Sequence, residues 1–277
     1  MSITLPKNDY ATAWRLIAAT SSHDNNIADV ILSKVLPGLE HEPTLLDVGA
    51  GSGAVSRRLA PHFGHMTLVE QNADQIATGQ AELDDLGATV FNGAFADFSS
   101  ADKFDVVLCS HVFYHVPRAE WSDFIDRLLG FVRPGGVCVV VLVGGPTDGA
   151  GHPLSALPPE HRPQQLPHTT HDALRKDFSD DAVNTDMFVA ELRSKDVPYE
   201  LVSTINTWDA RTIEEMYAIC RFVVFEDCLT PEQVAAMTGE QARALDAKIR
   251  GHAAACPYTD EMYHLEMEDG VVIITSR

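Results

Sequence analysis

The chain has 277 residues, of which 45% are apolar and 22% are charged, and these fractions exclude a chain that is disordered throughout. It carries 40 acidic and 20 basic residues, a formal net charge of −20 with histidine neutral. Because such a charge repels phosphate backbones, we expect no nucleic-acid partner.

Cysteine usage and apolar runs indicate the compartment. The five cysteines form no CxxC pair and no secreted-type framework, so reduced thiols are expected. The first fourteen residues lack a basic segment followed by an apolar one, which predicts no signal peptide. The longest apolar run, residues 137–143, is too short to cross a bilayer. We predict a cytoplasmic monomer or homodimer with no membrane partner.

Helical patterns open the chain. Residues 7–36 carry two of them, and in the second, isoleucines and valines recur at helical spacing after Asp24, a favourable N-cap residue. We interpret residues 1–40 as an N-terminal helical cap.

Strands and helices then alternate, which predicts a cofactor-binding core over residues 41–145. Strands are expected at 44–48, 65–70, 89–91, 104–109 and 137–143, with helices at 53–62, 73–86 and 121–132. Short, continuously apolar strands that alternate with helices indicate an α/β fold whose parallel sheet is covered on both faces.

The remainder, residues 146–277, is expected to be a helical insertion that covers the substrate, followed by C-terminal strands. Its first part is rich in proline and glycine and is too long for a plain connection. Helices are predicted near 170–195, at 212–226 and from Thr230, where Gln233 completes a capping box. Strands at 199–207 and 271–275 bring the total to seven. No linker divides the chain, so a single domain is predicted.

A glycine-rich turn provides the main functional signal. The strand that contains Asp47 runs into Gly49, Gly51 and Gly53, and a helix follows. Glycine lets the backbone turn sharply and lets a ligand approach the main chain. Glu70 ends the next strand about twenty residues on, where a carboxylate can accept hydrogen bonds from both hydroxyls of a ribose. These features predict an adenosine-containing cofactor.

The same glycines also fit a dinucleotide-binding pattern, in which Ala54 occupies the last position. Against a nicotinamide, Asp47 precedes the glycines, where it can receive an amino group. The third glycine also comes one residue early for a pyrophosphate. A tight turn that binds nothing is the further alternative.

The segments DVGAGSG, LVE, FDVVLCSHVFYHV and LLGFVRPGG occur in this order. They resemble the successive motifs of class I S-adenosylmethionine-dependent methyltransferases over residues 44–143. This resemblance implies a Rossmann-like sheet of seven strands, mostly parallel with the last strand antiparallel, and helices on both faces. It also implies S-adenosyl-L-methionine as the cofactor.

The resemblance assigns roles to matching residues. Asp47 and the backbones of Gly49 and Gly51 would hold the amino-acid part of the cofactor, and Glu70 the ribose hydroxyls. The other cofactor residues expected from it are Gly53, Gln75, Ala96, Asp97, Phe98 and Ser110, of which residues 96–98 lie where adenine is usually bound. Ala94 departs from the pattern, because many relatives have an acid there.

A narrower similarity to the histamine N-methyltransferases covers most of the chain. It is carried by SSHDNNIADVILSKVLPGL, LVEQNADQIA, SHVFYHV and YELVSTINTWDA. In that group a carboxylate at the position of Asp24 binds the substrate amine, and Gln75 matches a further cofactor contact. The similarity implies a small-molecule acceptor that is cationic or rich in nitrogen.

Candidates for acid–base work follow the fourth strand of the core. His111 and His115 are four residues apart and would share a face if a helical turn begins there. Either could act as the base for an acceptor, and Tyr114 could pack on the cofactor or the substrate. Ordinary surface or core imidazoles are the alternative.

Four histidines between residues 152 and 171 have spacings that match no familiar zinc site, so no metal is predicted. A proline-rich lid over the acceptor is expected instead.

The sequence therefore predicts a methyltransferase that acts on an amine, imidazole or guanidine nitrogen of a small molecule. O- or C-methylation of a secondary metabolite, an NAD-dependent oxidoreductase and a non-catalytic binding protein are the alternatives.

Overall fold

A computed structural model describes residues 13, 16–39, 42–144, 170–178 and 183–276. The chain divides into two compact units, which are treated separately below. The core unit comprises residues 24–162, 184–204 and 269–277, and the helical unit comprises residues 1–23, 163–183 and 205–268. The expected division into cap, core and lid stays a prediction.

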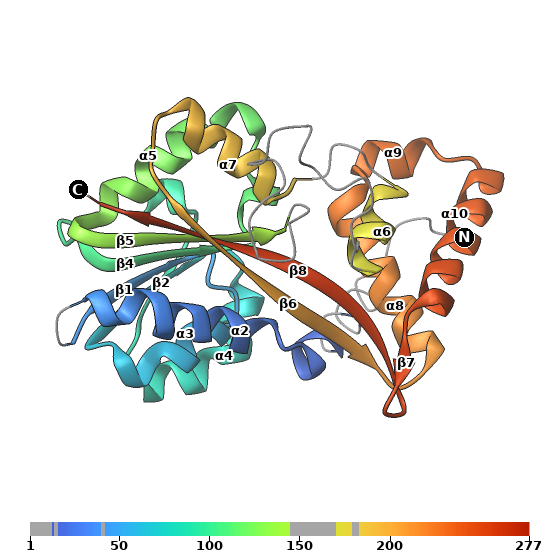
Figure 1. The fold of residues 1–277 in the computed structure, drawn as a ribbon, viewed down its shortest axis with the longest axis horizontal. Coiled ribbons are helices and arrows are strands. Elements are labelled where there is room, and N and C mark those ends of the chain that lie inside the picture. Colours follow the sequence, from blue (N-terminus) through green and yellow to red (C-terminus); the bar gives the residue numbers. More distant parts are fainter. Residues whose placement is uncertain (1–12, 14–15, 40–41, 145–169, 179–182, 277) are drawn as a thin grey trace. The chain divides into compact units, whose positions relative to one another are not determined.

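A mixed sheet organises the core unit (Figure 1). Its strands lie in the order β3-β2-β1-β4-β5-β8-β6. Strands β1 to β5 are parallel to their neighbours, and β8 is antiparallel to β5. The bounds are β1 (Thr44–Val48), β2 (His65–Glu70), β3 (Thr89–Asn92), β4 (Phe104–Ser110), β5 (Val132–Val143), β6 (Glu200–Ala210) and β8 (Met262–Thr275). The Rossmann-like fold with an antiparallel last strand is thereby confirmed.

Helices cover both faces of this sheet, as the alternating pattern predicts (Figure 1). One face carries α2 (His23–Val30), α3 (Ala54–Leu59) and α4 (Ala73–Asp85). The other face carries α5 (Trp121–Phe131) and α7 (Thr185–Ser194). Residues 31–38 extend α2 as a π turn and a 3₁₀ turn, which gives the second N-terminal helix nearly its expected length.

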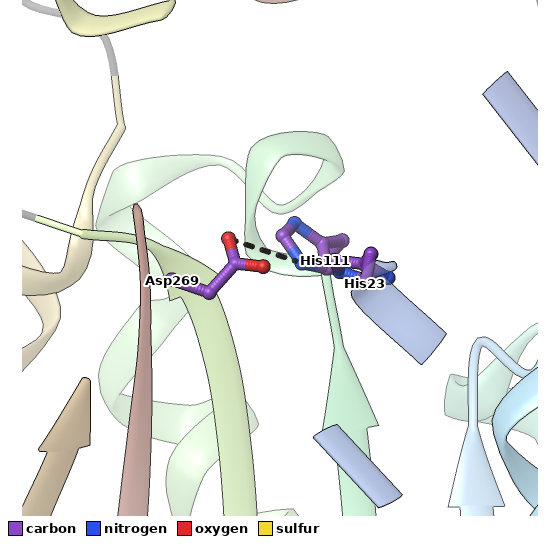
Figure 2. Close-up of side chains that lie close together, drawn as sticks. All are labelled: His23, His111 and Asp269. Carbon is purple, nitrogen blue, oxygen red and sulfur yellow. Dashed lines mark ion pairs between the residues drawn. The ribbon is translucent and has the colours of Figure 1, made fainter. Parts of the chain in front are cut away.

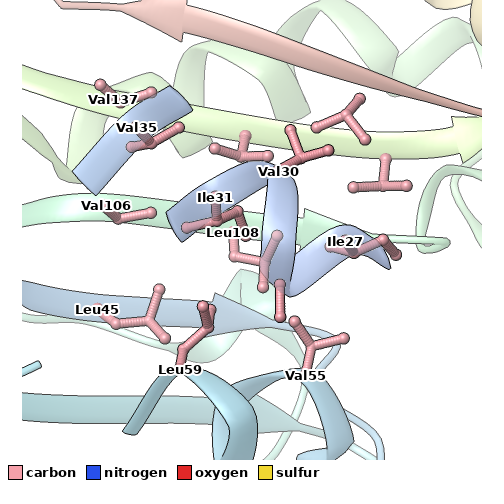
Figure 3. Close-up of a cluster of buried hydrophobic side chains, with 14 of the residues drawn as sticks. Ile27, Val30, Ile31, Val35, Leu45, Val55, Leu59, Val106, Leu108 and Val137 are labelled. Atoms are coloured by element: carbon pink, nitrogen blue, oxygen red, sulfur yellow. The ribbon is translucent and has the colours of Figure 1, made fainter. Parts of the chain in front are cut away.

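Alternation along the strands supplies the apolar core. On β4, Val106 and Leu108 point to the face that carries α2, and Val107 and Cys109 point to the other face. All four side chains are buried. Figure 3 shows Ile27 and other apolar residues of α2 and its extension packed over β1, β4 and β5. Each such side chain contributes about 1.5–3 kcal/mol by leaving water.

An aromatic cluster anchors the segment that follows β4. The ring of Phe113 lies 4.8 Å from that of Phe188, 5.1 Å from that of Trp121 and 5.2 Å from that of Phe124, measured between centroids. Edge-to-face rings at these distances attract one another beyond simple burial. The cluster therefore holds residues 113–115, a single 3₁₀ turn, in a fixed place beside the end of the strand.

The helical unit has its own apolar core. Its helices are α6 (Thr170–Lys176), α8 (Ile213–Val223), α9 (Pro231–Ala236) and α10 (Gly239–Ala255). Their shared core includes Met216, Ile219, Ile249 and Ala253. The short strand β7 (Tyr258–Thr259) pairs with β8 in this unit.

Several elements differ from the sequence prediction at their ends. Helix α2 begins at His23, so Asp24 lies in its first turn and is not its N-cap; a carboxylate there still favours the helix dipole. The capping box of Thr230 and Gln233 is confirmed. Helix α10 was not expected, because its sequence is polar and only Ile249 and Ala253 are buried. The sheet has eight strands because β7 adds a short one.

Candidate active site

The carboxyl ends of β1 and β4 define a candidate ligand site in the core unit. The chain continues from β1 to β2 on one side, and β4 lies on the other side of β1. In open α/β sheets, ligands bind outside the strand ends at such a reversal of strand order. The glycine-rich turn follows β1, and Ser110 and His111 follow β4.

The three glycines of the turn all have left-handed backbones. Their φ angles are +73° at Gly49, +57° at Gly51 and +74° at Gly53, a region that other residues rarely adopt. A Cβ added at Gly49 would lie 2.3 Å from Cγ2 of Val112. The turn after β1 and the segment after β4 therefore touch, and glycine at this position permits the contact.

Glu70 braces this turn from the end of β2. Its Oε2 accepts a hydrogen bond of 2.9 Å from the backbone N–H of Gly51, and its Oε1 accepts one of 2.7 Å from that of Asn72. Each carboxylate oxygen has two acceptor sites, so both can also receive a ribose hydroxyl. Glu70 therefore lies beside the glycine turn, as its place in the sequence predicts.

Asp47 lies under the turn and is 3% exposed. Ser56 donates a hydrogen bond of 2.6 Å from its hydroxyl to Oδ2 of Asp47. Burial raises the pKa of Asp47 from 3.8 to about 7, against the lowering effect of Ser56, and the charges of Glu70 and Asp24 raise it further. Three carboxylates thus act on one another here, an arrangement that favours a cationic ligand over an anionic one.

The expected adenine segment forms one 3₁₀ turn, Phe95–Asp97, which ends at Phe98. Ala96 and Asp97 are exposed. Phe98 is buried, with its ring centroid 5.3 Å from that of Phe131, so its side chain belongs to the core. Any contact of Phe98 with adenine would therefore come from its backbone.

Arg127 of α5 fixes this segment. Its guanidinium donates to the carbonyl of Phe95 at 3.1 and 2.9 Å, to that of Ala96 at 3.0 Å, and to that of Phe98. The group also lies over the ring of Phe95, 4.9 Å from its centroid. One planar guanidinium thereby orients the carbonyls of three residues of the loop.

Comparison with known proteins shows which proteins this part of the chain resembles. Residues 45–136 match a family described as a methyltransferase domain.

Relatives of the domain include two curated enzymes and a solved structure. The dTDP-3-amino-3,6-dideoxy-α-D-glucopyranose N,N-dimethyltransferase of Streptomyces fradiae is 34% identical over 105 residues, 36% of this chain and 40% of that enzyme. The ubiquinone biosynthesis O-methyltransferase of Rickettsia felis is 24% identical over 183 residues, 64% of this chain and 72% of that enzyme. A candidate methyltransferase from Bacillus halodurans C-125 superposes with a TM-score of 0.53 at 15% identity, over 91% of this chain and 98% of that one.

The matched residues make up a third of the chain, and the chain covers less than half of the first relative's own length. The narrower similarity to the histamine N-methyltransferases stays a prediction. Among the described residues, no helix combines the length and apolar character that a bilayer span requires.

The segment after β4 presents a hydrogen-bonded group of side chains. Nδ1 of His111 lies 3.1 Å from the hydroxyl oxygen of Tyr114, which accepts a hydrogen bond of 2.7 Å from the backbone N–H of Val143. Nε2 of His111 lies 3.6 Å from Oδ1 of Asp269. Figure 2 shows His111 at the end of β4 and Asp269 on β8, facing one another; His23, also drawn, belongs to the helical unit.

The expected pairing of His111 and His115 on one helical face does not occur. His111 has a φ of +56°, outside any helix, and the helical turn starts only at Phe113. His115 is exposed, whereas the His111 side chain is 23% exposed. The two histidines therefore differ in their surroundings. His111 is the one that contacts the polar side chains of Tyr114 and Asp269 in the core unit.

Other predicted residues take simpler positions. Gln75 is half-buried in the first turn of α4, which Asn72 caps by accepting the backbone N–H of Asp74 at 3.0 Å. Ser110 is half-buried at the end of β4. The candidate lid lies outside the described residues, as do three of its four histidines; the fourth, His171, is buried in the helical unit.

Sequence reasoning missed Asp269 and Arg127. Asp269 and Gly270 precede the apolar run of the last strand, and only the antiparallel pairing of β8 with β5 brings Asp269 to the edge of the sheet where the candidate site lies. Arg127 follows Asp126 on the polar side of α5, outside the apolar stripe, so its position alone does not distinguish it from an ordinary surface residue.

Proposed function

We propose that the chain is an S-adenosylmethionine-dependent methyltransferase that acts on a nitrogen of a small molecule. The observation that carries the choice of cofactor is the group of carboxylates at the glycine turn. The donor carries a sulfonium and an ammonium, and both charges are attracted by Asp24, Asp47 and Glu70. The pyrophosphate of a nicotinamide dinucleotide would be repelled by the same charges.

The residues of the core unit fit this cofactor part by part. Asp47 would receive the ammonium, because a nearby positive charge offsets the burial that raises its pKa. The left-handed glycines leave the backbone open to the amino-acid part, since a Cβ at Gly51 would meet nothing within 4 Å. Glu70 would receive the ribose hydroxyls, and the loop held by Arg127 would lie along adenine.

When bound, the cofactor supplies a methyl group that its positive sulfur has already activated. The chain then has to bring the acceptor into line with that methyl group and to exclude water. An acceptor nitrogen must also lose a proton before or after transfer. His111 and Tyr114 stand at the carboxyl end of β4, next to the glycine turn, where they would take that proton.

Asp24, in the first turn of α2, is the proposed partner for a cationic acceptor, with His115 as a second contact from the exposed side. The acidic balance of the chain agrees with such an acceptor. The relative from Streptomyces fradiae is an N,N-dimethyltransferase, which supports nitrogen as the acceptor atom.

O-methylation is the second candidate. It is favoured by the similarity to the Rickettsia O-methyltransferase, which spans more of the chain than the first match does. A hydroxyl acceptor also has to lose its proton, and the same pair of His111 and Tyr114 would serve it.

A methyl-transfer screen tests both candidates. The protein is incubated with S-adenosylmethionine and with separate panels of amines, imidazoles, guanidines and phenols, and products are read by mass. We expect a gain of one or more methyl groups on a nitrogen compound, abolished in Glu70→Ala. Transfer confined to the phenols would replace the first candidate with the second. No binding of S-adenosylhomocysteine would overturn both.

A further inference from the structure

We infer that Asp269 is a positioning residue that fixes the ring and the proton of His111. The inference deepens the proposed function and rests on it for the catalytic consequence. The tautomer of His111 in the resting protein is a further consequence, and it can be tested without turnover.

Strand β8 is antiparallel to β5, and this direction places Asp269 at the edge of the sheet where the candidate site lies. In the antiparallel pair, Asp269 is opposite Val143, the last residue of β5. The carboxyl ends of β1, β4 and β5 lie at one edge of the sheet, so the residue opposite Val143 lies there too. Asp269 is fully buried, so its carboxylate is held in an environment where its charge acts strongly.

The backbone around Asp269 has little freedom to move. A Cβ added at the next residue, Gly270, would lie 2.4 Å from Oγ1 of Thr185, so α7 packs directly on the strand. The same hydroxyl of Thr185 lies 3.1 and 2.9 Å from the carbonyls of Leu142 and Val143. Helix α7 therefore contacts both the end of β5 and the residues of β8 that pair with it.

The backbone of His111 is held as firmly. Its φ of +56° lies in the left-handed region, which a residue with a side chain rarely adopts. Its N–H donates to the carbonyl of Val141 at 2.9 Å. Backbone strain of this kind persists only where the surroundings impose it. The imidazole is therefore presented to Tyr114 and Asp269 from a fixed point.

The inferred role requires one tautomer of His111, and the contacts agree with it. The backbone N–H of Val143 donates to the hydroxyl oxygen of Tyr114, so the hydroxyl hydrogen is directed elsewhere, and Nδ1 of His111 lies 3.1 Å away. In this arrangement Nδ1 accepts from the hydroxyl, and Nε2, which lies 3.6 Å from Oδ1 of Asp269, carries the ring hydrogen. The assignment predicts the Nε2–H tautomer of His111.

This arrangement suits removal of a proton from the acceptor. The acceptor N–H bond breaks as its proton joins the oxygen of Tyr114, and the original hydroxyl proton passes to Nδ1 of His111. The ring then carries a positive charge, which the carboxylate of Asp269 balances. Without that carboxylate the ring can turn or take the other tautomer, and Nδ1 no longer faces the hydroxyl.

Nitrogen-15 spectroscopy of the histidine rings, with His111 assigned through His111→Gln, tests the assignment directly. In the wild-type protein we expect the neutral Nε2–H form. In Asp269→Asn we expect a mixture of tautomers, and in Asp269→Glu a partial return. A wild-type ring with its proton on Nδ1, or a ring signal unchanged in Asp269→Asn, would overturn the inference, whether or not the chain transfers methyl groups.

Turnover gives the second readout. With an acceptor from the screen, we expect kcat of Asp269→Asn to fall at least tenfold while S-adenosylhomocysteine affinity stays within twofold, with partial rescue by Asp269→Glu. The matched control is Asp105→Asn, a buried acid on β4 that bonds to Thr44 and Arg133; it should lower stability and leave the His111 signal and kcat unchanged. Equal loss of kcat in both variants would overturn the inference.

Discussion

The carboxylate of Glu70 accepts a hydrogen bond of 2.9 Å from the backbone N–H of Gly51, across nineteen residues of sequence. One side chain thus shapes the glycine turn and is placed to meet a ligand inside it. Glu70→Ala removes a charged acceptor, worth about 1.5–3 kcal/mol, so S-adenosylhomocysteine affinity should fall roughly 10- to 150-fold. Calorimetry measures this. Glu70→Gln should lose less, and an unchanged affinity in Glu70→Ala would place the ribose elsewhere.

Asp47 makes stability depend on pH. Its pKa is about 7 in the folded chain against 3.8 ordinarily, so between these values the folded state binds more protons than the unfolded state. The free energy of unfolding should therefore fall as pH rises from 4 to 7. Asp47→Asn should remove this dependence and be the more stable form at pH 8 without ligand, as measured by denaturant unfolding. A steeper fall in Asp47→Asn would contradict the assignment.

Asp47 should also make the affinity for S-adenosylhomocysteine depend on pH. An ammonium beside Asp47 favours its ionised form, so binding below pH 7 should release a proton. S-adenosylhomocysteine affinity should rise by up to tenfold per pH unit towards pH 7 and then level off. Titrations in buffers of different ionisation enthalpy count the proton. Ser56→Ala, which removes the hydroxyl that bonds to Asp47, should move the levelling point to higher pH.

Gly49 and Val112 make the turn after β1 sensitive to one methyl group. Gly49→Ala should lower stability by about 1–2 kcal/mol for its backbone and roughly 1–3 kcal/mol for the clash with Val112. Gly51→Ala carries the backbone cost without the clash, so it is the matched control. Thermal unfolding compares the two. Adding Val112→Ala should recover part of the loss in Gly49→Ala; no recovery would mean that the contact is not the cause.

Substitution of Arg127 should weaken cofactor binding more than it lowers the stability of the fold. A lysine cannot span the three carbonyls that the guanidinium reaches, so Arg127→Lys should loosen the loop and weaken S-adenosylhomocysteine binding about tenfold. Arg118→Lys is the control, because Arg118 also lies over an aromatic ring, 3.9 Å from the centroid of Trp121, but does not touch the loop. Equal losses in both variants would show a general effect on α5 and its surroundings.

The sequence predicted the arrangement of the glycine turn better than that of the segment after β4. The glycine turn and Glu70 lie within one strand–helix–strand unit, where local spacing determines position. Asp269 is 158 residues from His111, and their approach depends on the direction of β8, which no local pattern records. The helical alignment of His111 and His115 failed because His111 adopts a left-handed backbone, a choice that tertiary packing imposes.

Calorimetric titration of the whole chain with S-adenosylhomocysteine, and separately with NAD, shows which of the two cofactors the glycine turn and Glu70 bind. We expect saturable binding of one S-adenosylhomocysteine per chain, lost or greatly weakened in Glu70→Ala, and no heat from NAD. Saturable binding of NAD with no response to S-adenosylhomocysteine would contradict this expectation.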